Sequence, residues 1–291
     1  MLTKKTIGFI GAGNLAEALI KGLISSKTAS PANILVSDCA AARLVHITGT
    51  YEVRALTKNY ETARDADIIF ITVKPKDAAG AVIEIAPELD GKKVIISAVA
   101  GVTTDAITRW TISGCKNGEK GIHPPIIRAM PNTPVIVREG MTALYAGEYV
   151  KQDHLKLARA VFEAVGKVIV LEDEALMDAV TGLSGSGPAY IFLVMEAMMN
   201  AGIKLGLSEG DARTLALQTT LGAAALAGQS KETLQELRRM VASPGGTTIE
   251  GLKKLDEGGL DAVIMAAVKA AATRATEISR EASEPPAPEK K

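Results

Sequence analysis

The sequence predicts a protein of the α/β class, whose first part builds a parallel sheet and whose second part is helical throughout. Two observations carry this prediction. Short β-rich runs alternate with helical runs as far as about residue 170, and beyond Glu172 the β-branched runs disappear. The 291 residues suffice for about two domains, and a hydrophobic content of 47% is ample for buried cores. We therefore expect one domain over residues 1–172 and a second over residues 173–282.

The first domain is expected to contain a series of short strands separated mainly by helical runs, which is typical of successive βαβ units. The expected strands are Thr6–Ile10, Ile34–Ser37, Val53–Leu56, Ile68–Val73, Lys93–Ser97, Ile126–Met130, Met141–Ala146 and Lys167–Leu171. In a parallel sheet of this kind, the carboxyl ends of the strands form the edge at which ligands bind.

The second domain is expected to be built from helices alone, because Ala, Leu, Met and Val dominate its sequence. The expected helices are Ala175–Val180, Ala189–Leu205, Glu209–Ala227, Lys231–Val241, Thr248–Asp256 and Leu260–Ser279. Residues 283–291 are rich in proline and charge, so we expect a disordered tail there.

The segment Thr6–Gly22 joins the first expected strand to a Gly-x-Gly-x-x-Ala turn and then to a helical pattern. Gly11 permits the tight turn, Gly13 lets the backbone approach a pyrophosphate, and the small Ala16 lets the helix pack against the strand. The free N–H groups at the start of the helix favour a negatively charged diphosphate. These features predict a Rossmann-like dinucleotide-binding domain; the alternative is a structural turn that binds no ligand.

Charge and hydropathy argue against several classes of partner. The 33 basic and 33 acidic residues cancel, so no global field draws the chain to nucleic acid or to an anionic membrane. Glu196 and Asn200 interrupt the most hydrophobic later stretch, and no apolar leader precedes the first strand. We therefore expect a cytoplasmic protein without a membrane partner.

The cysteines and histidines lack the spacing of a metal site. Cys39 and Cys115 lie far apart and form no Cys-x-x-Cys pattern, so we expect reduced thiols and no metal. His46 and His154 fall in polar helical patterns, and His123 precedes two prolines in a loop. None of them has the setting of a catalytic histidine.

Several expected strands end in residues suited to a ligand site. Ser37 and Asp38 end the second strand, about where a ribose-contacting residue is expected. The fourth strand runs into Val73–Pro75, the fifth into the small residues Ser97–Val102, and the sixth into the stiff loop Arg128–Pro134. Small residues let a flat nicotinamide ring lie against the backbone. The alternative for Lys74 is a solvated side chain that binds no ligand.

Two glycine-rich segments interrupt the helices of the second domain. Thr181–Ala189 places Pro188 at a plausible first helical position. In Ser243–Glu250, Thr247 and Glu250 have the spacing of a capping box, so the glycines lead into a helix N-terminus that could hold a small carboxylate. The alternative is an ordinary turn between two helices.

Five motifs together, in this order and over nearly the whole chain, resemble the pyrroline-5-carboxylate reductase family: Gly8–Ala18, Val73–Pro75, Ala129–Pro134, Thr181–Tyr190 and Ser243–Thr248. The resemblance implies the last step of proline biosynthesis, in which NADPH or NADH reduces the cyclic imino acid 1-pyrroline-5-carboxylate to L-proline. It also implies a homodimer built through the helical domain, with each active site between one subunit's nucleotide domain and the partner's helices. Many members of the family assemble further into rings of dimers.

The resemblance implies roles for individual residues as well. It places the pyrophosphate on Gly11, Gly13, Asn14 and Leu15, the adenosine ribose near Ser37, Asp38 and Asn59, and the nicotinamide near Val73, Lys74, Pro75 and Ala100. It places the substrate near Glu174, Ser243, Gly246, Thr247 and Thr248. The Thr248 hydroxyl is then the catalytic group that partners the imine nitrogen. Two residues depart from the family pattern. Many relatives have a neutral or basic residue in place of Asp38, and some have a polar residue in place of Met240.

The implied reaction needs no metal, because a protonated imine already has an electron-poor carbon and the protein has only to position the hydride donor against it. Two enzyme alternatives remain. One is an imine reductase for a larger ring; the other is a hydroxyacid dehydrogenase, whose general acid, Lys204 or Lys253, has no supporting motif. A nucleotide-sensing module without catalysis is a third alternative. Ser243–Thr248 argues against it, since a sensor needs no second anion pocket.

Overall fold

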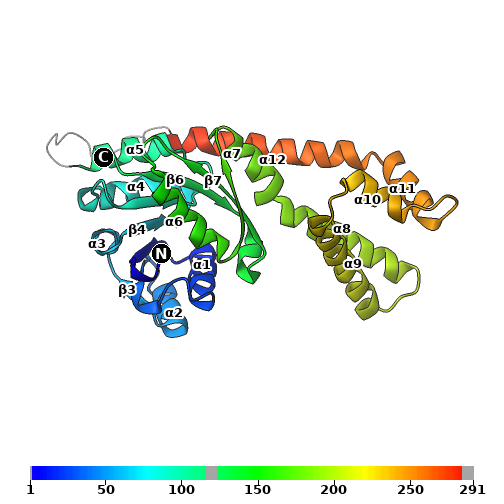
Figure 1. Ribbon diagram of the computed structural model, residues 1–291, viewed down its shortest axis with the longest axis horizontal. Helices are drawn as coiled ribbons and strands as arrows, with labels where there is room; N and C mark the ends of the chain where they lie inside the picture. Colours follow the sequence, from blue (N-terminus) through cyan, green and yellow to red (C-terminus); the bar gives the residue numbers. More distant parts are fainter. Residues whose placement is uncertain (1, 116–122, 284–291) are drawn as a thin grey trace, which may run out of the picture. The chain divides into compact units, whose positions relative to one another are not determined.

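The first part of the chain forms an eight-stranded sheet with the strand order β3-β2-β1-β4-β5-β6-β7-β8 (Figure 1). The computed structural model describes residues 2–115 and 123–283. Its strands are β1 (Ile7–Ile10), β2 (Ile34–Ser37), β3 (Arg54–Leu56), β4 (Ile68–Ile71), β5 (Val94–Ser97), β6 (Ile126–Pro131), β7 (Gly140–Ala146) and β8 (Gly166–Leu171). Each expected strand is therefore present. The strand order changes direction between β1 and β4, and this is where open α/β sheets bind their ligands.

One pair of strands departs from the expected parallel arrangement. β7 runs antiparallel to β6, whereas the other pairs among the described strands are parallel. The connection between them extends only from Asn132 to Glu139 and contains the short 3-10 helix η5 (Thr133–Val137). A parallel crossover needs about a dozen residues or more, so this connection can only return the chain in the opposite direction.

Contacts divide the chain into two compact units, Met1–Gly185 with Ala270–Lys291, and Ser186–Lys269. These units are defined by contacts, and their limits differ from the domain boundary expected at residue 172. That boundary stays a prediction. Besides the sheet, the first unit contains the end of α12 (Leu260–Ser283) and the following helices: η1 (Leu2–Lys4), α1 (Asn14–Ser25), η2 (Pro31–Asn33), α2 (Ala41–Tyr51), α3 (Asn59–Asp65), α4 (Pro75–Ile85), η3 (Ala86–Glu88), α5 (Thr104–Gly114), α6 (Gln152–Glu163), α7 (Leu176–Val180) and the π-helical turn η6 (Thr181–Gly185). The tail residues 284–291 lie outside the described residues.

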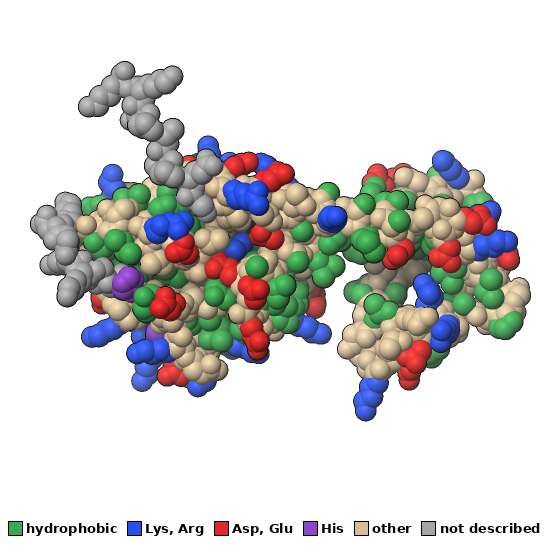
Figure 2. Space-filling view, turned by 90° about the horizontal axis from the view of Figure 1, so that it is seen from above, with side chains coloured by type: hydrophobic (Ala, Val, Ile, Leu, Met, Phe, Trp, Pro, Cys, Tyr) green, Lys and Arg blue, Asp and Glu red, His purple; other side chains and the backbone are tan. Residues whose placement is uncertain are grey.

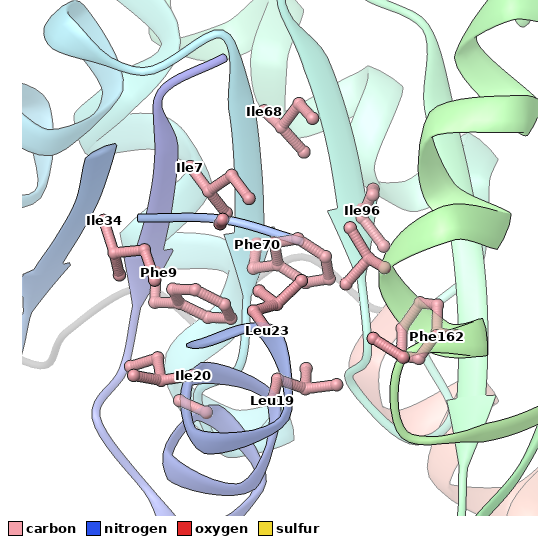
Figure 3. Packing of buried hydrophobic residues seen from close by; sticks show 14 of the residues in the cluster. Ile7, Phe9, Leu19, Ile20, Leu23, Ile34, Ile68, Phe70, Ile96 and Phe162 are labelled. Carbon is pink, nitrogen blue, oxygen red and sulfur yellow. The ribbon is translucent and has the colours of Figure 1, made fainter. Parts of the chain in front are cut away.

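The sheet buries apolar side chains on both faces, as parallel sheets do. Successive residues of a strand point to opposite faces, so Phe9 packs with α1 and α6 on one side and Ile10 packs with α4 and α5 on the other. Figure 3 shows Phe9, Phe70 and Phe162 close together on the first side. The rings of Phe9 and Phe70 stack at 4.8 Å, and Phe162 of α6 meets Phe70 edge-on at 6.0 Å. Each pair contributes about 0.5–1.5 kcal/mol beyond the buried area, and the second pair holds α6 on the sheet.

The second unit is purely helical, as expected, and buries little of its own apolar surface. It contains α8 (Gly187–Lys204), α9 (Glu209–Gln229), α10 (Leu234–Val241), α11 (Thr247–Glu257) and the start of α12. All of its residues are described, and only Ala212 and Ala216 are buried hydrophobic residues. Phe192, Leu193 and Leu221 are 62%, 66% and 63% exposed, and Figure 2 shows hydrophobic side chains at the surface of this unit. An apolar surface of this extent marks an interaction face.

None of the helices in the described ranges is long and apolar enough to cross a membrane.

Candidate functional site

The glycine turn after β1 has the geometry that a bound phosphate requires. Gly11 has a φ of +98°, and a Cβ there would come within 2.8 Å of the Thr72 carbonyl oxygen, so only glycine fits. Gly13 is the N-cap of α1 and has no side-chain cap, while a Cβ built on it would meet nothing within 4 Å. The first N–H groups of α1 therefore have no side-chain cap, and the space beside Gly13 is open, which leaves these donors available to an anion.

Asp38, at the end of β2, holds the glycine turn in place. Its Oδ2 accepts the backbone N–H of Ala12 at 2.7 Å, and its Oδ1 accepts that of Ala40 at 2.7 Å. Each carboxylate oxygen has a second lone pair, so Asp38 can still accept a hydrogen bond from a ribose hydroxyl. The backbone contacts also fix the carboxylate beside the site.

Asn59 is positioned by two neighbours. The buried Ser37 hydroxyl donates to Asn59 Oδ1 at 2.9 Å, and Asn59 Nδ2 donates to Glu84 Oε2 at 2.7 Å. Glu84 Oε1 also accepts the Asn59 backbone N–H at 3.0 Å. Ser37 therefore acts on the site through Asn59, and Glu84 is a supporting residue that the sequence reasoning missed.

A cavity of about 780 Å³ lies at these strand ends. It is lined by Gly11, Gly13, Asp38, Cys39, Ala40, Arg43, Asn59, Thr72, Val73, Lys74, Lys76, Asp77, Gly80 and Ala81. The structure thus brings together six of the residues expected to bind the cofactor: Gly11, Gly13, Asp38, Asn59, Val73 and Lys74. A concave site with fixed backbone donors suits a dinucleotide.

The other expected cofactor residues lie outside the lining of this cavity. Asn14 is exposed in the first turn of α1, and Leu15 packs partly against the core. Pro75 lines a neighbouring hollow of about 450 Å³ with Lys74 and residues of α12. Ala100 is half-buried, ahead of a glycine that packs directly against α12.

Glu174 lies in a partly buried polar cluster that joins the sheet to three helices. Its Oε1 accepts the Thr104 backbone N–H at 2.9 Å, and its Oε2 accepts the Thr104 hydroxyl at 2.7 Å. Arg128, only 4% exposed, reaches Glu174 Oε1 with Nη1 at 3.3 Å and Asp178 Oδ1 with Nη2 at 3.5 Å. The Thr276 hydroxyl of α12 donates to Asp178 Oδ2 at 2.8 Å. Glu174 thus has a structural role that the sequence reasoning did not give it.

The sequence contained a signal for this cluster. Glu174 lies just before the helix expected over Ala175–Val180, and Asp178 follows four residues later within it. Arg128 interrupts an otherwise apolar strand, and a buried arginine requires partners of opposite charge.

In the second unit, Ser243–Thr248 leads into α11, but the expected capping box is wrong. Gly246 has extended backbone and is the N-cap, so Thr247 is the first helical residue, and the cap has no side-chain hydrogen bond. Gly245 has a φ of +72°, and the Gly246 N–H donates to the Ser243 carbonyl at 2.9 Å. The first N–H groups of α11 therefore have no carboxylate cap, which leaves them available to an anionic ligand. A capping box does occur one helix earlier, where Thr233 and Glu236 begin α10.

Within the described ranges, no group of three His, Cys, Asp or Glu side chains is placed to hold a metal ion. Cys39 is exposed and Cys115 is half-buried, and both are free thiols.

Comparison with known proteins identifies the family. Residues 174–278 match the family model described as pyrroline-5-carboxylate reductase dimerisation, and residues 6–101 match the one described as NADP oxidoreductase, coenzyme F420-dependent. A pyrroline-5-carboxylate reductase of Pseudomonas aeruginosa is 40% identical over 275 residues, which cover 94% of this chain and 97% of that protein. The chain belongs to the pyrroline-5-carboxylate reductase family. The resemblance inferred from the five motifs is thereby confirmed.

Other members of the family agree in sequence and in fold. The pyrroline-5-carboxylate reductase of Methanosarcina acetivorans is 37% identical, and the match covers 96% of this chain and 100% of that protein. The solved reductase of Coxiella burnetii has a TM-score of 0.86 and 38% identity, over 94% of this chain and 98% of that one. The reductase of Plasmodium falciparum, solved with NADP bound, has a TM-score of 0.83 and 28% identity, over 95% of this chain and 99% of that one. The reductase fold, a Rossmann-like domain followed by a helical dimerisation domain, is thus confirmed for this chain.

Proposed function

We propose that the chain catalyses the NADPH- or NADH-dependent reduction of 1-pyrroline-5-carboxylate to L-proline, the last step of proline biosynthesis. The observation that carries the proposal is the open start of α1 above the 780 Å³ cavity, in a chain 40% identical to a reductase of this name. The family relation supplies the substrate, and the cavity supplies a place for a dinucleotide.

The residues present fit a nicotinamide cofactor. The N–H groups at Gly13, Asn14 and Leu15 can hold the pyrophosphate, and Asp38 and Asn59 can hold the adenosine ribose. Val73, Lys74, Pro75 and Ala100 remain our proposed surroundings of the nicotinamide. When bound, the reduced cofactor supplies a hydride to the carbon of the C=N bond.

The substrate carboxylate is proposed to bind at the uncapped start of α11, with Ser243, Gly246 and Thr247 as its donors. The Thr248 hydroxyl then hydrogen-bonds to the substrate nitrogen, which changes from iminium to amine as the ring carbon accepts the hydride. Glu174 is proposed to lie close to the substrate while it holds the start of α5.

We further propose a homodimer that pairs the apolar faces of the helical units, and a ring of such dimers. The exposed Phe192, Leu193 and Leu221 support the dimer, because a monomer would leave them in water. The free thiols of Cys39 and Cys115 are consistent with a reducing cytoplasm, where we place the enzyme.

The decisive experiment follows oxidation of the reduced cofactor with 1-pyrroline-5-carboxylate and with its six-membered homologue, and reduction of the oxidised cofactor with a set of 2-hydroxy acids. We expect rapid turnover with the five-membered imine and none with the hydroxy acids. Preferred turnover of the six-membered imine would indicate a different imine reductase. Turnover restricted to hydroxy acids would overturn the proposal, and binding without any turnover would favour a nucleotide sensor.

A further inference from the structure

Glu17, in the first turn of α1, accepts hydrogen bonds from side chains of α2. Arg43 donates from Nη2 to Glu17 Oε2 at 2.7 Å, His46 Nε2 lies 2.8 Å from Oε1, and the Tyr51 hydroxyl donates to Oε1 at 3.2 Å. Burial opposes ionisation of this carboxyl, but the hydrogen bonds outweigh burial and hold the pKa of Glu17 below its ordinary value. Glu17 is therefore negatively charged at neutral pH and lies directly against Arg43.

Arg43 is also tied to the glycine turn and lies on the cofactor cavity. Its Nε donates to the Ala12 carbonyl at 2.8 Å, and its side chain is part of the cavity lining. Two of its nitrogens are thus engaged by the protein. An arginine binds phosphate most strongly when it offers two parallel N–H groups and an unpaired charge. With Nε and Nη2 bonded to the protein and its charge balanced by Glu17, Arg43 is a weakened phosphate ligand in its present position.

Asp38 adds a negative charge to the same end of the cavity. A 2′-phosphate, which distinguishes NADPH from NADH, would meet the Asp38 carboxylate and an arginine whose charge is already balanced. A ribose 2′-hydroxyl would meet a carboxylate that can accept its hydrogen bond. The local charges therefore favour the cofactor without the phosphate.

We propose that Glu17 determines cofactor specificity by withholding Arg43 from the 2′-phosphate, which lets the chain use NADH as readily as NADPH. This inference rests on the proposed binding of a nicotinamide cofactor in the 780 Å³ cavity. Glu17 acts through Arg43 and is a positioning residue. Its effect is expected in the ratio of the two affinities and not in the chemical step.

The test compares the dissociation constants of NADPH and NADH in the absence of substrate, for the wild-type chain and for Glu17→Gln. The glutamine has the same size and keeps an acceptor for Arg43 but removes the charge. Hydrogen bonds to charged groups contribute more than neutral ones, so we expect the NADPH-to-NADH affinity ratio to rise about tenfold. Glu17→Ala, which removes the carboxylate altogether, should shift the ratio in the same direction.

Two further variants identify the route of the effect. Tyr51→Phe removes an uncharged donor to Glu17 and leaves the Arg43 pair intact, so the ratio should stay at its wild-type value. In an Arg43→Gln background, Glu17→Gln should no longer change the ratio.

An unchanged ratio in Glu17→Gln, a shift towards NADH, or an equal shift in the presence and absence of Arg43 would overturn the inference. These measurements need no turnover. A protein that binds both cofactors but does not reduce the imine would therefore refute the proposed function. The affinity ratios would still decide the role of Glu17.

Discussion

Arg128→Met tests the partly buried polar cluster that holds β6 to α7. Arg128 is 4% exposed in β6 and lies between the carboxylates of Glu174 and Asp178. Methionine retains an apolar chain of similar length, so the substitution removes the charge with little change in packing. The two carboxylates then face each other without their shared cation.

The geometry sets the expected magnitude. Breaking a buried ion pair by removing one partner costs about 3–5 kcal/mol, because it leaves an uncompensated charge. Here the contacts are long, at 3.3 and 3.5 Å, and the carboxylates of Glu174 and Asp178 are 19% and 21% exposed, so water still reaches them. Glu174 also keeps its hydrogen bonds from Thr104, and Asp178 keeps the one from Thr276. We therefore expect the lower end, a loss of about 3 kcal/mol in the free energy of unfolding.

Urea unfolding at one protein concentration measures this loss, because assembly makes apparent stability depend on concentration. Arg109→Met is the matched control: its pair with Asp105 is 53% and 71% exposed, so its loss should change stability by no more than about 0.5 kcal/mol. If Arg128→Met unfolded at the same urea concentration as Arg109→Met, the cluster would contribute nothing and the reasoning would be refuted.

Three other sets of variants test separate parts of the structure. Thr248→Ala should lower kcat on the order of 10²–10⁴-fold in steady-state assays while Thr248→Ser recovers most of the rate; undiminished turnover of a folded alanine variant would leave Thr248 no catalytic role. Gly22→Ala should lower the free energy of unfolding by about 1–3 kcal/mol in urea, because the added Cβ would overlap Val165. Gly49 is exposed in a helix, so Gly49→Ala should raise the same free energy by about 0.5–1 kcal/mol. The opposite order of the two variants would contradict the packing. Burial opposes the charge of Asp67, but hydrogen bonds from a lysine and from the backbone outweigh it and lower the pKa of this carboxyl below 3.8. The stabilisation is therefore present above that pH and is lost as the pH falls through the lowered pKa. In Asp67→Asn the free energy of unfolding should fall less steeply with acid, and an acid-unfolding curve identical to that of the wild type would exclude the effect.

The strands of this chain could be predicted from sequence because most of them are short β-branched runs bounded by turn residues, a signal that is local. The direction of β7 was missed for a related reason. The strand itself is visible in the sequence, but its direction depends on the length of the connection Asn132–Glu139. Helix and strand patterns contain no information about direction unless that length is considered as well. The capping box expected at Thr247 failed because Gly246 takes the extended N-cap conformation first.

The site shows the same division between local and long-range information. Gly11 and Gly13 are predictable because a turn motif fixes their backbone, and Asp38 is predictable from its place at a strand end. The partnership of Arg128 with Asp178 joins residues 50 positions apart, and that of Glu17 with Arg43 joins two helices. Such pairs depend on how elements pack, and a single sequence does not specify which of several carboxylates a buried arginine meets.

The two helices proposed to bind anions share a feature that costs helix stability. α1 begins after Gly13 and α11 begins after Gly246, and neither N-cap has a side-chain hydrogen bond. Serine, threonine or aspartate would cap these N–H groups, as Ser208 and Thr233 do for α9 and α10 in the same unit as α11. A capping oxygen would also occupy the donors that a phosphate or a carboxylate needs. At the two proposed sites the chain leaves these donors open, so that the anion itself completes the helix.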